Sequence, residues 1–306
     1  MDVAPRTVTV ARLQQAITLG LQLAAAGWAA WCWPRAPGVA AAGVLLLLGG
    51  HALFLGAECV AMAWVNRHDP APRARLGQVL RAWAVESVTS PRVFCWQQPF
   101  RSRAVPDLLP DDGSAAGRQG VVLVHGLACN RGFWNPWLRV LRAQGRPCVA
   151  VDLEPPFAPI DAYVATIDAA VVRMAAATGR PPVLVGHSMG GLAIRAWLRA
   201  AGDDRRVARI VTLGSPHQGT WLGRFGRRGN GVQMRCGSDW LCALAASESP
   251  QRRALFVCWY SNCDNIVFPA SVATLEGADN RFADGVPHVA LAFDRRVRAA
   301  VLDLLR

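Results

Sequence analysis

The sequence contains no lysine, so arginine supplies all 33 basic side chains and the formal net charge of +12. It also lacks a nucleic-acid-binding motif, which makes DNA or RNA an unexpected partner in spite of this charge. A basic surface of this kind favours anionic lipid headgroups, and a solvated face without any partner is the simpler alternative. We therefore expect no nucleic acid among the partners of this chain.

The nine cysteines show none of the paired spacings that bind zinc. Free thiols in a reducing compartment are their expected state. In an oxidising compartment, Cys236 could pair with Cys242, or Cys258 with Cys263. The sequence therefore predicts neither a metal nor a cofactor.

Two long apolar runs occupy the N-terminal part of the chain, Leu13 to Trp33 and Val39 to Val65. Each is as long as the roughly 20 residues that cross a bilayer as a helix, although glutamines dilute the first run. We predict a membrane anchor of two transmembrane helices over residues 1–66, and a cleaved signal peptide is the alternative for the first run. Because this anchor ends well before the predicted sheet, we expect it to be removable without loss of a core strand.

The second apolar run also carries His51 and Glu58, which share a helix face because they are seven residues apart. They mark either a polar contact inside the membrane or, more simply, a packed histidine and a glutamate near the interface. Arginines are concentrated outside the two runs, with Arg35 alone between them. This distribution predicts a protein of the inner membrane whose main domain lies in the cytoplasm.

Strand and helix patterns alternate in the rest of the chain. Residues 67–118 are interpreted as a juxtamembrane helix over Arg73 to Val88, a strand over Arg92 to Trp96, and a linker. Residues 119–306 predict an α/β domain, with a mostly parallel central sheet and helices on both faces. Its strands are expected at 120–126, 147–152, 182–185, 207–214, 253–260 and 271–275, and its last helix at 289–305.

A segment without a sheet pattern interrupts this domain at about 216–253. It is rich in glycine and also contains large apolar residues such as Trp221 and Phe225. Apolar side chains on such an insertion are typical of a lid over an apolar substrate. An ordinary packed excursion is the alternative.

The most informative stretch is Gly186-His-Ser-Met-Gly190, which follows an apolar strand and opens a helical pattern. A serine on so tight a turn has a strained backbone, and Gly186 and Gly190 let neighbouring backbone approach it. Ser188 is therefore the candidate nucleophile. The N–H group of Met189, at the start of the helix, can stabilise an oxyanion. A glycine-rich turn around a buried serine is the simpler alternative.

A second informative stretch, His125-Gly126-Leu127, follows the first strand of the domain. Its loop lies at the carboxyl end of that strand, where α/β sheets bind ligands. The backbone N–H group of Leu127 is the expected second oxyanion donor. His125 either orients this loop by hydrogen bonding or is a satisfied core histidine.

A serine nucleophile needs a base, and a carboxylate that holds the base in the right tautomer. In this architecture the chain order is serine, acid, base. His288 lies in the loop before the last helix, whereas His217 follows the serine too closely to leave room for an acid. Asp264 comes directly after a predicted strand and 24 residues before His288. Asp239 and Glu276 are weaker candidates for the acid.

Together these stretches resemble the α/β-hydrolase superfamily, and four of them carry the resemblance: His125-Gly126, Gly186–Gly190, Asp264–Pro269 and His288. Within that superfamily, Gly214-Ser-Pro-His-Gln-Gly-Thr220 is similar to a segment of bacterial triacylglycerol lipases and esterases, although Ser215 replaces the usual threonine. The resemblance covers residues 119–306 and implies an α/β-hydrolase fold. It also implies that the nucleophile, acid, base and oxyanion donors stand at the positions proposed above. The sequence shows no calcium site of the kind that some of those lipases carry, so no metal is expected.

We therefore expect a serine hydrolase, a lipase or esterase, that cleaves carboxylic esters with a lipid-like or other apolar acyl chain. Acyl transfer and thioester cleavage use the same chemistry and stay open. The alternative from another class is a membrane-anchored scaffold protein with a catalytically silent hydrolase fold.

Overall fold

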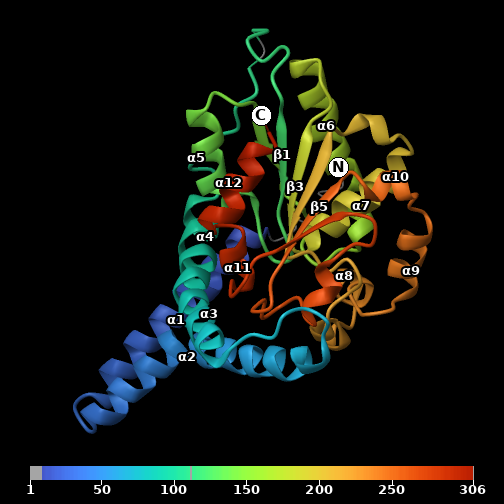
Figure 1. The fold of residues 1–306 in the computed structure, drawn as a ribbon. Helices are drawn as coiled ribbons and strands as arrows, with labels where there is room; N and C mark the ends of the chain where they lie inside the picture. Colours follow the sequence, from blue (N-terminus) through green and yellow to red (C-terminus); the bar gives the residue numbers. More distant parts are fainter. Residues whose placement is uncertain (1–8, 111, 306) are drawn as a thin grey trace, which may run out of the picture.

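A sheet of parallel strands forms the centre of the molecule (Figure 1). The computed structural model describes residues 9–110 and 112–305, and within them the sheet has six strands in the order β2-β1-β3-β4-β5-β6. The strands are β1 (Val121–Val124), β2 (Cys148–Ala150), β3 (Val183–His187), β4 (Arg209–Leu213), β5 (Phe256–Tyr260) and β6 (Asp279–Phe282). Because every neighbouring pair is parallel, all the carboxyl ends meet at one edge of the sheet.

Helices cover both faces of this sheet. On one face lie α5 (Asn135–Ala143) and α12 (Arg295–Asp303), and on the other lie α6 (Val164–Thr178) and α7 (Met189–Ala201) (Figure 1). Alternate residues of β1 therefore belong to two different cores: Leu123 to the first and Val122 to the second. Burial on both faces explains why the central strands are continuous apolar runs rather than alternating ones.

The predicted insertion contains a 3₁₀ helix, Trp221–Phe225, and three short α-helices, α8 (Gly229–Gln233), α9 (Asp239–Ala246) and α10 (Pro250–Arg253). The last predicted helix is divided into α11 (His288–Leu291) and α12, because the side chain of Asp294 caps a new helix start at the N–H groups of Arg296 and Val297.

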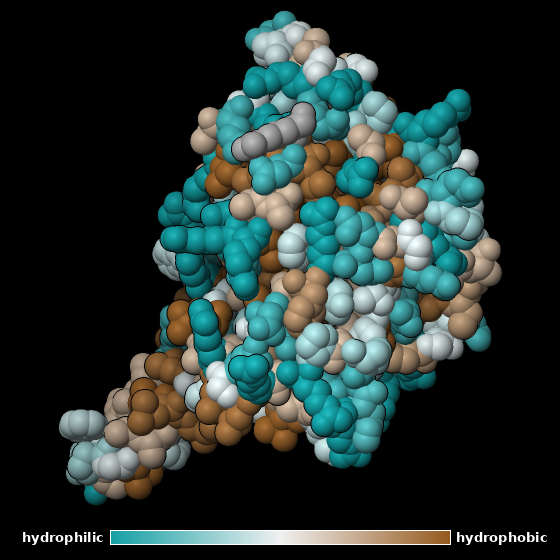
Figure 2. All heavy atoms as spheres, in the orientation of Figure 1, coloured by the Kyte–Doolittle hydropathy of each residue, from teal (hydrophilic) through white to brown (hydrophobic). Residues whose placement is uncertain are grey.

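The two N-terminal apolar runs form the helices α1 (Val10–Cys32) and α2 (Pro37–Val65), which pack against each other. Their connected ends project from the body of the molecule (Figure 1), and apolar side chains gather on this projection (Figure 2). Among the described residues, a single helical stretch, Pro37–His68, is long and apolar enough to cross a membrane. The prediction of two transmembrane helices is therefore not confirmed.

Two of the glutamines that dilute α1 hold it against the body of the molecule: Gln14 binds the loop after β1 in the α/β domain, and Gln15 binds the segment that precedes the domain. The side-chain amide of Gln14 donates to the carbonyl of Ala128 at 3.0 Å, and that of Gln15 donates to the carbonyl of Pro99 at 2.6 Å. These contacts give the first apolar run a role in packing on the domain.

The second half of α2 and the following helix α3 (Leu76–Pro91) also pack on the domain. Asn66, at the end of α2, donates to the carbonyl of Asn262 at 3.2 Å and accepts from the N–H of Ala270 at 3.0 Å. Cys59 and Met62 of α2 share an apolar cluster with Phe268. No strand of the sheet lies within the described residues 9–66, as expected, but these contacts join α2 to the domain.

Two predicted strands are wrong. Residues Arg92–Gln97 continue α3 as a π-helical segment that leads into α4 (Gln98–Arg101). The side chain of Gln97 donates to the carbonyls of Gly132 and Phe133 and so joins this segment to the domain. Residues Ala270–Ala273 form a 3₁₀ turn instead of the last strand. The last strand is β6, whose polar sequence suits the edge of a sheet, where one side has no neighbouring strand.

All nine cysteines are free thiols in the structure, so neither of the two candidate disulfides is formed.

We predict that Asn66→Ala destabilises the whole molecule, because it leaves the buried carbonyl of Asn262 and the N–H of Ala270 without a partner. Such a loss costs about 1–3 kcal/mol of unfolding free energy. Thermal unfolding of the full chain in detergent measures the effect. The matched control on α2 is Leu53→Ala, whose side chain is 67% exposed. An unchanged melting temperature in Asn66→Ala would show that these two hydrogen bonds do not stabilise the molecule.

Candidate active site

Ser188 lies on the tight turn between β3 and α7. Its backbone angles are φ 54° and ψ −129°, a conformation that is strained for any residue other than glycine. The neighbouring glycines are sterically required. A Cβ atom at Gly190 would lie 2.4 Å from the carbonyl oxygen of Val124, and one at Gly186 would lie 2.8 Å from the amide nitrogen of Gly191. Strain of this kind, maintained by the surrounding packing, is typical of functional sites.

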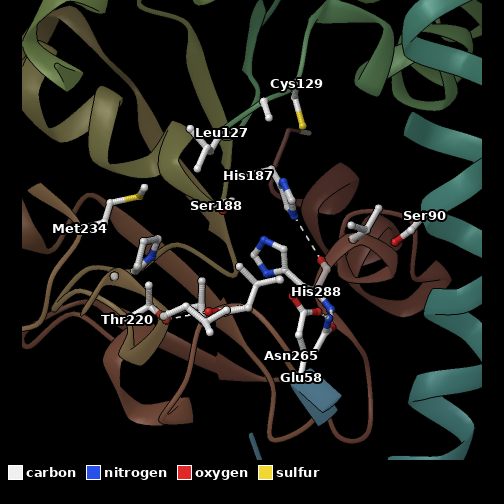
Figure 3. A pocket seen from close by; sticks show the side chains of 18 of the residues that line it. Glu58, Ser90, Leu127, Cys129, His187, Ser188, Thr220, Met234, Asn265 and His288 are labelled. Carbon is white, nitrogen blue, oxygen red and sulfur yellow. Dashed lines mark hydrogen bonds between the residues drawn. The ribbon is translucent and has the colours of Figure 1, made fainter. Parts of the chain in front are cut away.

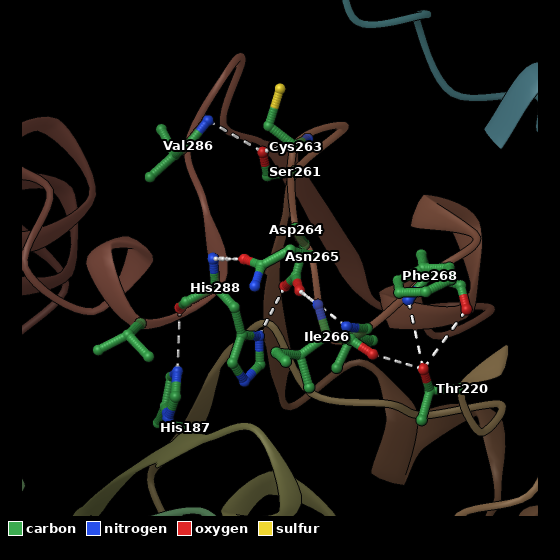
Figure 4. A network of polar contacts seen from close by, with 12 residues as sticks. His187, Thr220, Ser261, Cys263, Asp264, Asn265, Ile266, Phe268, Val286 and His288 are labelled. Atoms are coloured by element: carbon green, nitrogen blue, oxygen red, sulfur yellow. Dashed lines mark hydrogen bonds and ion pairs between the residues drawn. The ribbon is translucent and has the colours of Figure 1, made fainter. Parts of the chain in front are cut away.

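Asp264 and His288 form a buried pair (Figure 4). Asp264 follows β5, and its Oδ2 atom lies 2.9 Å from Nδ1 of His288, the first residue of α11. The other carboxylate oxygen accepts the N–H groups of Ile266 and Val267 at 3.0 and 2.7 Å. The carboxylate is therefore fixed, and it orients the imidazole with Nδ1 as the donor.

Ser188 and His288 line the same cavity, which has a volume of about 510 Å³ (Figure 3). Its wall is largely apolar. Besides the turn of Ser188 and the start of α11, it is formed by the loop after β1, the helices α2 and α3 with the segment that continues α3, the insertion, and the segment after β5. Apolar lining residues from these parts include Leu55, Phe94, Leu127, Leu222, Met234, Ile266 and Val267.

The charge of His288 depends on three carboxylates. Burial by itself would lower the pKa of this imidazole, but the negative charges of Asp264, Glu86 and Glu58 outweigh burial and hold the pKa above its ordinary value. The neutral imidazole, which alone can accept a proton, is therefore populated only at higher pH than for an exposed histidine.

His187, a site residue that the sequence analysis did not single out, supports His288 from the other side. Its ring stacks on Phe133, with centroids 4.6 Å apart, and its Nε2–H donates to the carbonyl of His288 at 3.1 Å. Burial and the nearby His288 keep the pKa of His187 well below its ordinary value. His187 is therefore a neutral hydrogen-bond donor. Its position inside the Gly186–Gly190 motif was the feature of the sequence that could have assigned it to the site.

The loop after β1 is held by His125. The Nδ1 atom of His125 donates to the carbonyl of Gly126 at 2.9 Å, while Nε2 accepts the N–H of Leu153 at 3.0 Å. Burial lowers the pKa of His125, so the ring is neutral. Leu127 follows in this loop and lines the cavity near Ser188 (Figure 3). Met189 is the first residue of α7, where backbone N–H groups have no partner within the helix.

Three further polar residues beside His288 were not assigned to the site from the sequence. Asn265 accepts the N–H of His288 at 3.3 Å and donates to Glu58 of α2 at 2.8 Å. Glu86 of α3 accepts the N–H of Val289 at 2.7 Å. The sequence offered Glu58 only as a polar residue in an apolar run, and the structure places it in the cavity wall.

The remaining candidates lie elsewhere. Asp239 is exposed at the start of α9, and the side chain of Glu276 is 95% exposed. His217 is buried, where it contacts Thr212 at 2.9 Å, and burial keeps its pKa well below the ordinary value. His51 contacts the carbonyl of Ser87 on α3, which agrees with the interpretation of a histidine packed on a neighbouring helix.

Comparison with known proteins connects this geometry to a family. The sequence profile described as "Alpha/beta hydrolase family" matches residues 121–305. The Esterase PIR7B of Oryza sativa subsp. japonica is 30% identical over 141 residues, which cover 40% of this chain and 51% of that protein. A triacylglycerol lipase of Burkholderia plantarii is 35% identical over 132 residues, covering 40% of this chain and 36% of the lipase. The chain thus spans about half and about a third of these relatives.

Solved structures agree in fold. The mature lipase BlEst2 of Bacillus licheniformis superposes with a TM-score of 0.55 at 19% sequence identity, covering 65% of this chain and 95% of that one. Aspergillus fumigatus lipase B gives a TM-score of 0.51 at 15% identity over 90% of this chain and 70% of that one. At these identities the likeness concerns the fold alone.

We predict that Gly214→Ala separates Asp264 from His288. Gly214 has φ +58°, and a Cβ atom there would lie 2.8 Å from Oδ2 of Asp264 and 3.3 Å from Nδ1 of His288. Thermal unfolding and the NMR signal of the hydrogen-bonded imidazole N–H measure the effect.

Gly202→Ala is the matched control for this substitution. Gly202 has φ +66°, but a Cβ atom there would meet nothing within 4 Å. The variant therefore loses only the roughly 1–2 kcal/mol of unfolding free energy that a left-handed backbone costs an alanine. Equal melting temperatures and an unchanged imidazole signal in the two variants would contradict the prediction.

Proposed function

Because the chain belongs to the Alpha/beta hydrolase family, we propose that it is a serine hydrolase of carboxylic esters in which Ser188, Asp264 and His288 form the catalytic triad. The observation that carries the proposal is a strained serine that shares an apolar cavity with a buried Asp–His pair. Lipases and esterases among the related proteins support ester hydrolysis as the reaction class.

In the proposed reaction, the hydroxyl oxygen of Ser188 attacks the acyl carbonyl while Nε2 of His288 takes the hydroxyl proton. The N–H groups of Met189 and Leu127 donate to the tetrahedral oxyanion. His288 then protonates the leaving alcohol. Water hydrolyses the acyl-enzyme by the reverse path, with His288 again as the base. Asp264 keeps the imidazole in the tautomer that has its lone pair on Nε2.

The proposed substrate class follows from the cavity. Its volume of about 510 Å³ and its leucine, valine, isoleucine and phenylalanine side chains suit an apolar acyl chain. Thr220, Leu222 and Met234 of the insertion contribute to the wall, which supports the interpretation of residues 216–253 as a lid.

We also propose that α2 anchors the protein in a membrane, with α1 packed beside it. The apolar side chains on the projecting ends of both helices support this anchor. The arginines outside the hairpin support a location of the α/β domain on the cytoplasmic side. An apolar ester would then reach the cavity close to the membrane surface.

The proposal is tested with the full-length protein in detergent. A panel of p-nitrophenyl esters of increasing acyl length measures hydrolysis and chain-length preference, and a fluorophosphonate probe reports an activated serine. We expect labelling and hydrolysis that both require Ser188. A folded protein that neither reacts with the probe nor hydrolyses any ester would support the silent scaffold instead.

We predict that Ser188→Ala and His288→Ala each lower kcat by about three orders of magnitude or more without unfolding the protein, because members of a triad act as one unit. Combining the two substitutions should cost little more than either alone. Additive losses in the double variant would show that the two residues do not share one mechanism.

We predict that Asp264→Asn lowers kcat steeply, by up to about 10⁴-fold, because an amide favours the wrong imidazole tautomer. Asp239→Asn and Glu276→Gln are the matched controls, since both side chains are exposed. Kinetics on one p-nitrophenyl ester measure all three variants. The assignment of the acid is wrong if either control loses more activity than Asp264→Asn.

A further inference from the structure

Two buried carboxylates beside His288 have no role in the mechanism described above. Glu58 belongs to α2 and Glu86 to α3, and their residues are 9% and 1% exposed. Both line the cavity, although both come from helices outside the α/β domain. An ionised carboxylate is expensive to bury unless it is paired, so both side chains need an explanation.

Glu86 binds the turn that carries His288. Its Oε1 accepts the N–H of Val289 at 2.7 Å, and its Oε2 accepts the N–H of Ala290 at 3.2 Å. These N–H groups belong to the first turn of α11, where a helix provides no acceptors of its own. The carboxylate thus fixes the backbone directly after the proposed base.

Glu58 fixes the same turn through Asn265. Oε2 of Glu58 accepts the side-chain N–H of Asn265 at 2.8 Å, and Oδ1 of Asn265 accepts the N–H of His288 at 3.3 Å (Figure 4 shows the second contact). The three successive N–H groups of residues 288–290 are therefore bound by the amide of Asn265 and the carboxylate of Glu86. The amide is held by Glu58 of α2, and Glu86 itself belongs to α3.

We propose that Glu58 and Glu86 are positioning residues: they hold the turn that carries His288 so that its imidazole faces Ser188, and they make catalysis depend on the packing of α2 and α3 against the domain. This inference rests on the proposed function. It gives the N-terminal helices a catalytic role in addition to membrane attachment.

The charges around His288 agree with this role. The groups that face it are Asp264 from the segment after β5, Glu58 from α2, Glu86 from α3, and the neutral His187 beside Ser188. Burial raises the pKa of Glu86 to about 7, against the opposing effect of the N–H of Val289. An uncharged amide of the same shape would avoid this cost of burial.

Kinetics of Glu86→Gln and Glu86→Ala on a p-nitrophenyl ester test the proposal in the full-length protein. We expect kcat to fall about 10- to 100-fold in Glu86→Ala, the size of effect that follows a small misplacement of a catalytic group, with KM nearly unchanged. Glu86→Gln should recover part of the loss, because its amide oxygen still accepts the N–H of Val289. Glu58→Gln should also lower kcat with KM nearly unchanged. The exposed Glu276→Gln is the control and should have the kcat of the wild type.

The pH dependence of kcat/KM distinguishes a positioning role of Glu86 from a purely structural one. Removing the charge of Glu86 lowers the pKa of His288, so the acid limb of kcat/KM should move to lower pH in Glu86→Gln. The pH dependence of the unfolding free energy should also differ between the wild type and Glu86→Gln. Because the folded pKa of Glu86 is raised, its stabilising contribution is complete below about pH 4.5 and is lost as the pH rises through about 7. The wild type should lose stability over that range, and Glu86→Gln should lose less.

The outcomes are distinguishable. Folded Glu86→Gln and Glu58→Gln variants with wild-type kcat and a wild-type pH profile would overturn the positioning role. Failure of the wild type to react with a fluorophosphonate probe would instead overturn the proposed function. If Glu86→Ala does not fold, the two glutamine variants still decide the question.

Discussion

The tight passage from β3 into α7 is the constraint on which the rest of the site depends. The backbone of Gly190 packs so closely against β1 that a single methyl group would reach the carbonyl of Val124. Since β1 and β3 are parallel neighbours, with Val124 opposite Gly186, this contact places the loop after β1 beside Ser188. Backbone packing alone thus brings the proposed nucleophile beside the loop that carries Leu127, one of the proposed oxyanion donors.

The proposed base is placed by side chains rather than by the sheet. His288 lies in a connection after the edge strand β6, and Asp264 contacts its imidazole while His187 and Asn265 contact its backbone. Negative charge gathers around it from three segments of the chain. This arrangement favours the charged form of His288, as the proposed reaction requires, and its cost is the desolvation of carboxylates such as Glu86.

The helix α2 combines two environments along one stretch of sequence. Leu53 and Phe54 are each 67% exposed on its outer side, as suits a helix against lipid, whereas Leu55 and Glu58 face the cavity. Attachment to a membrane and formation of the acyl pocket would thus be carried out by neighbouring residues. Under the proposed function, an apolar substrate would travel only a short distance between the bilayer and Ser188.

Local sequence determined the central features of this protein: the parallel strands, because they are buried on both faces and must be apolar throughout, and the serine turn, because only glycines allow its close contacts. Tertiary structure alone decided the rest. Glu58 and Glu86 bind residues more than 200 positions away in the chain. In α2, apolar residues lie on all sides of the helix, so no hydrophobic periodicity marks the face that lines the cavity. The edge strand β6 was not predicted because an edge position tolerates polar residues. The local sequence pattern carries no information about which distant residues become neighbours.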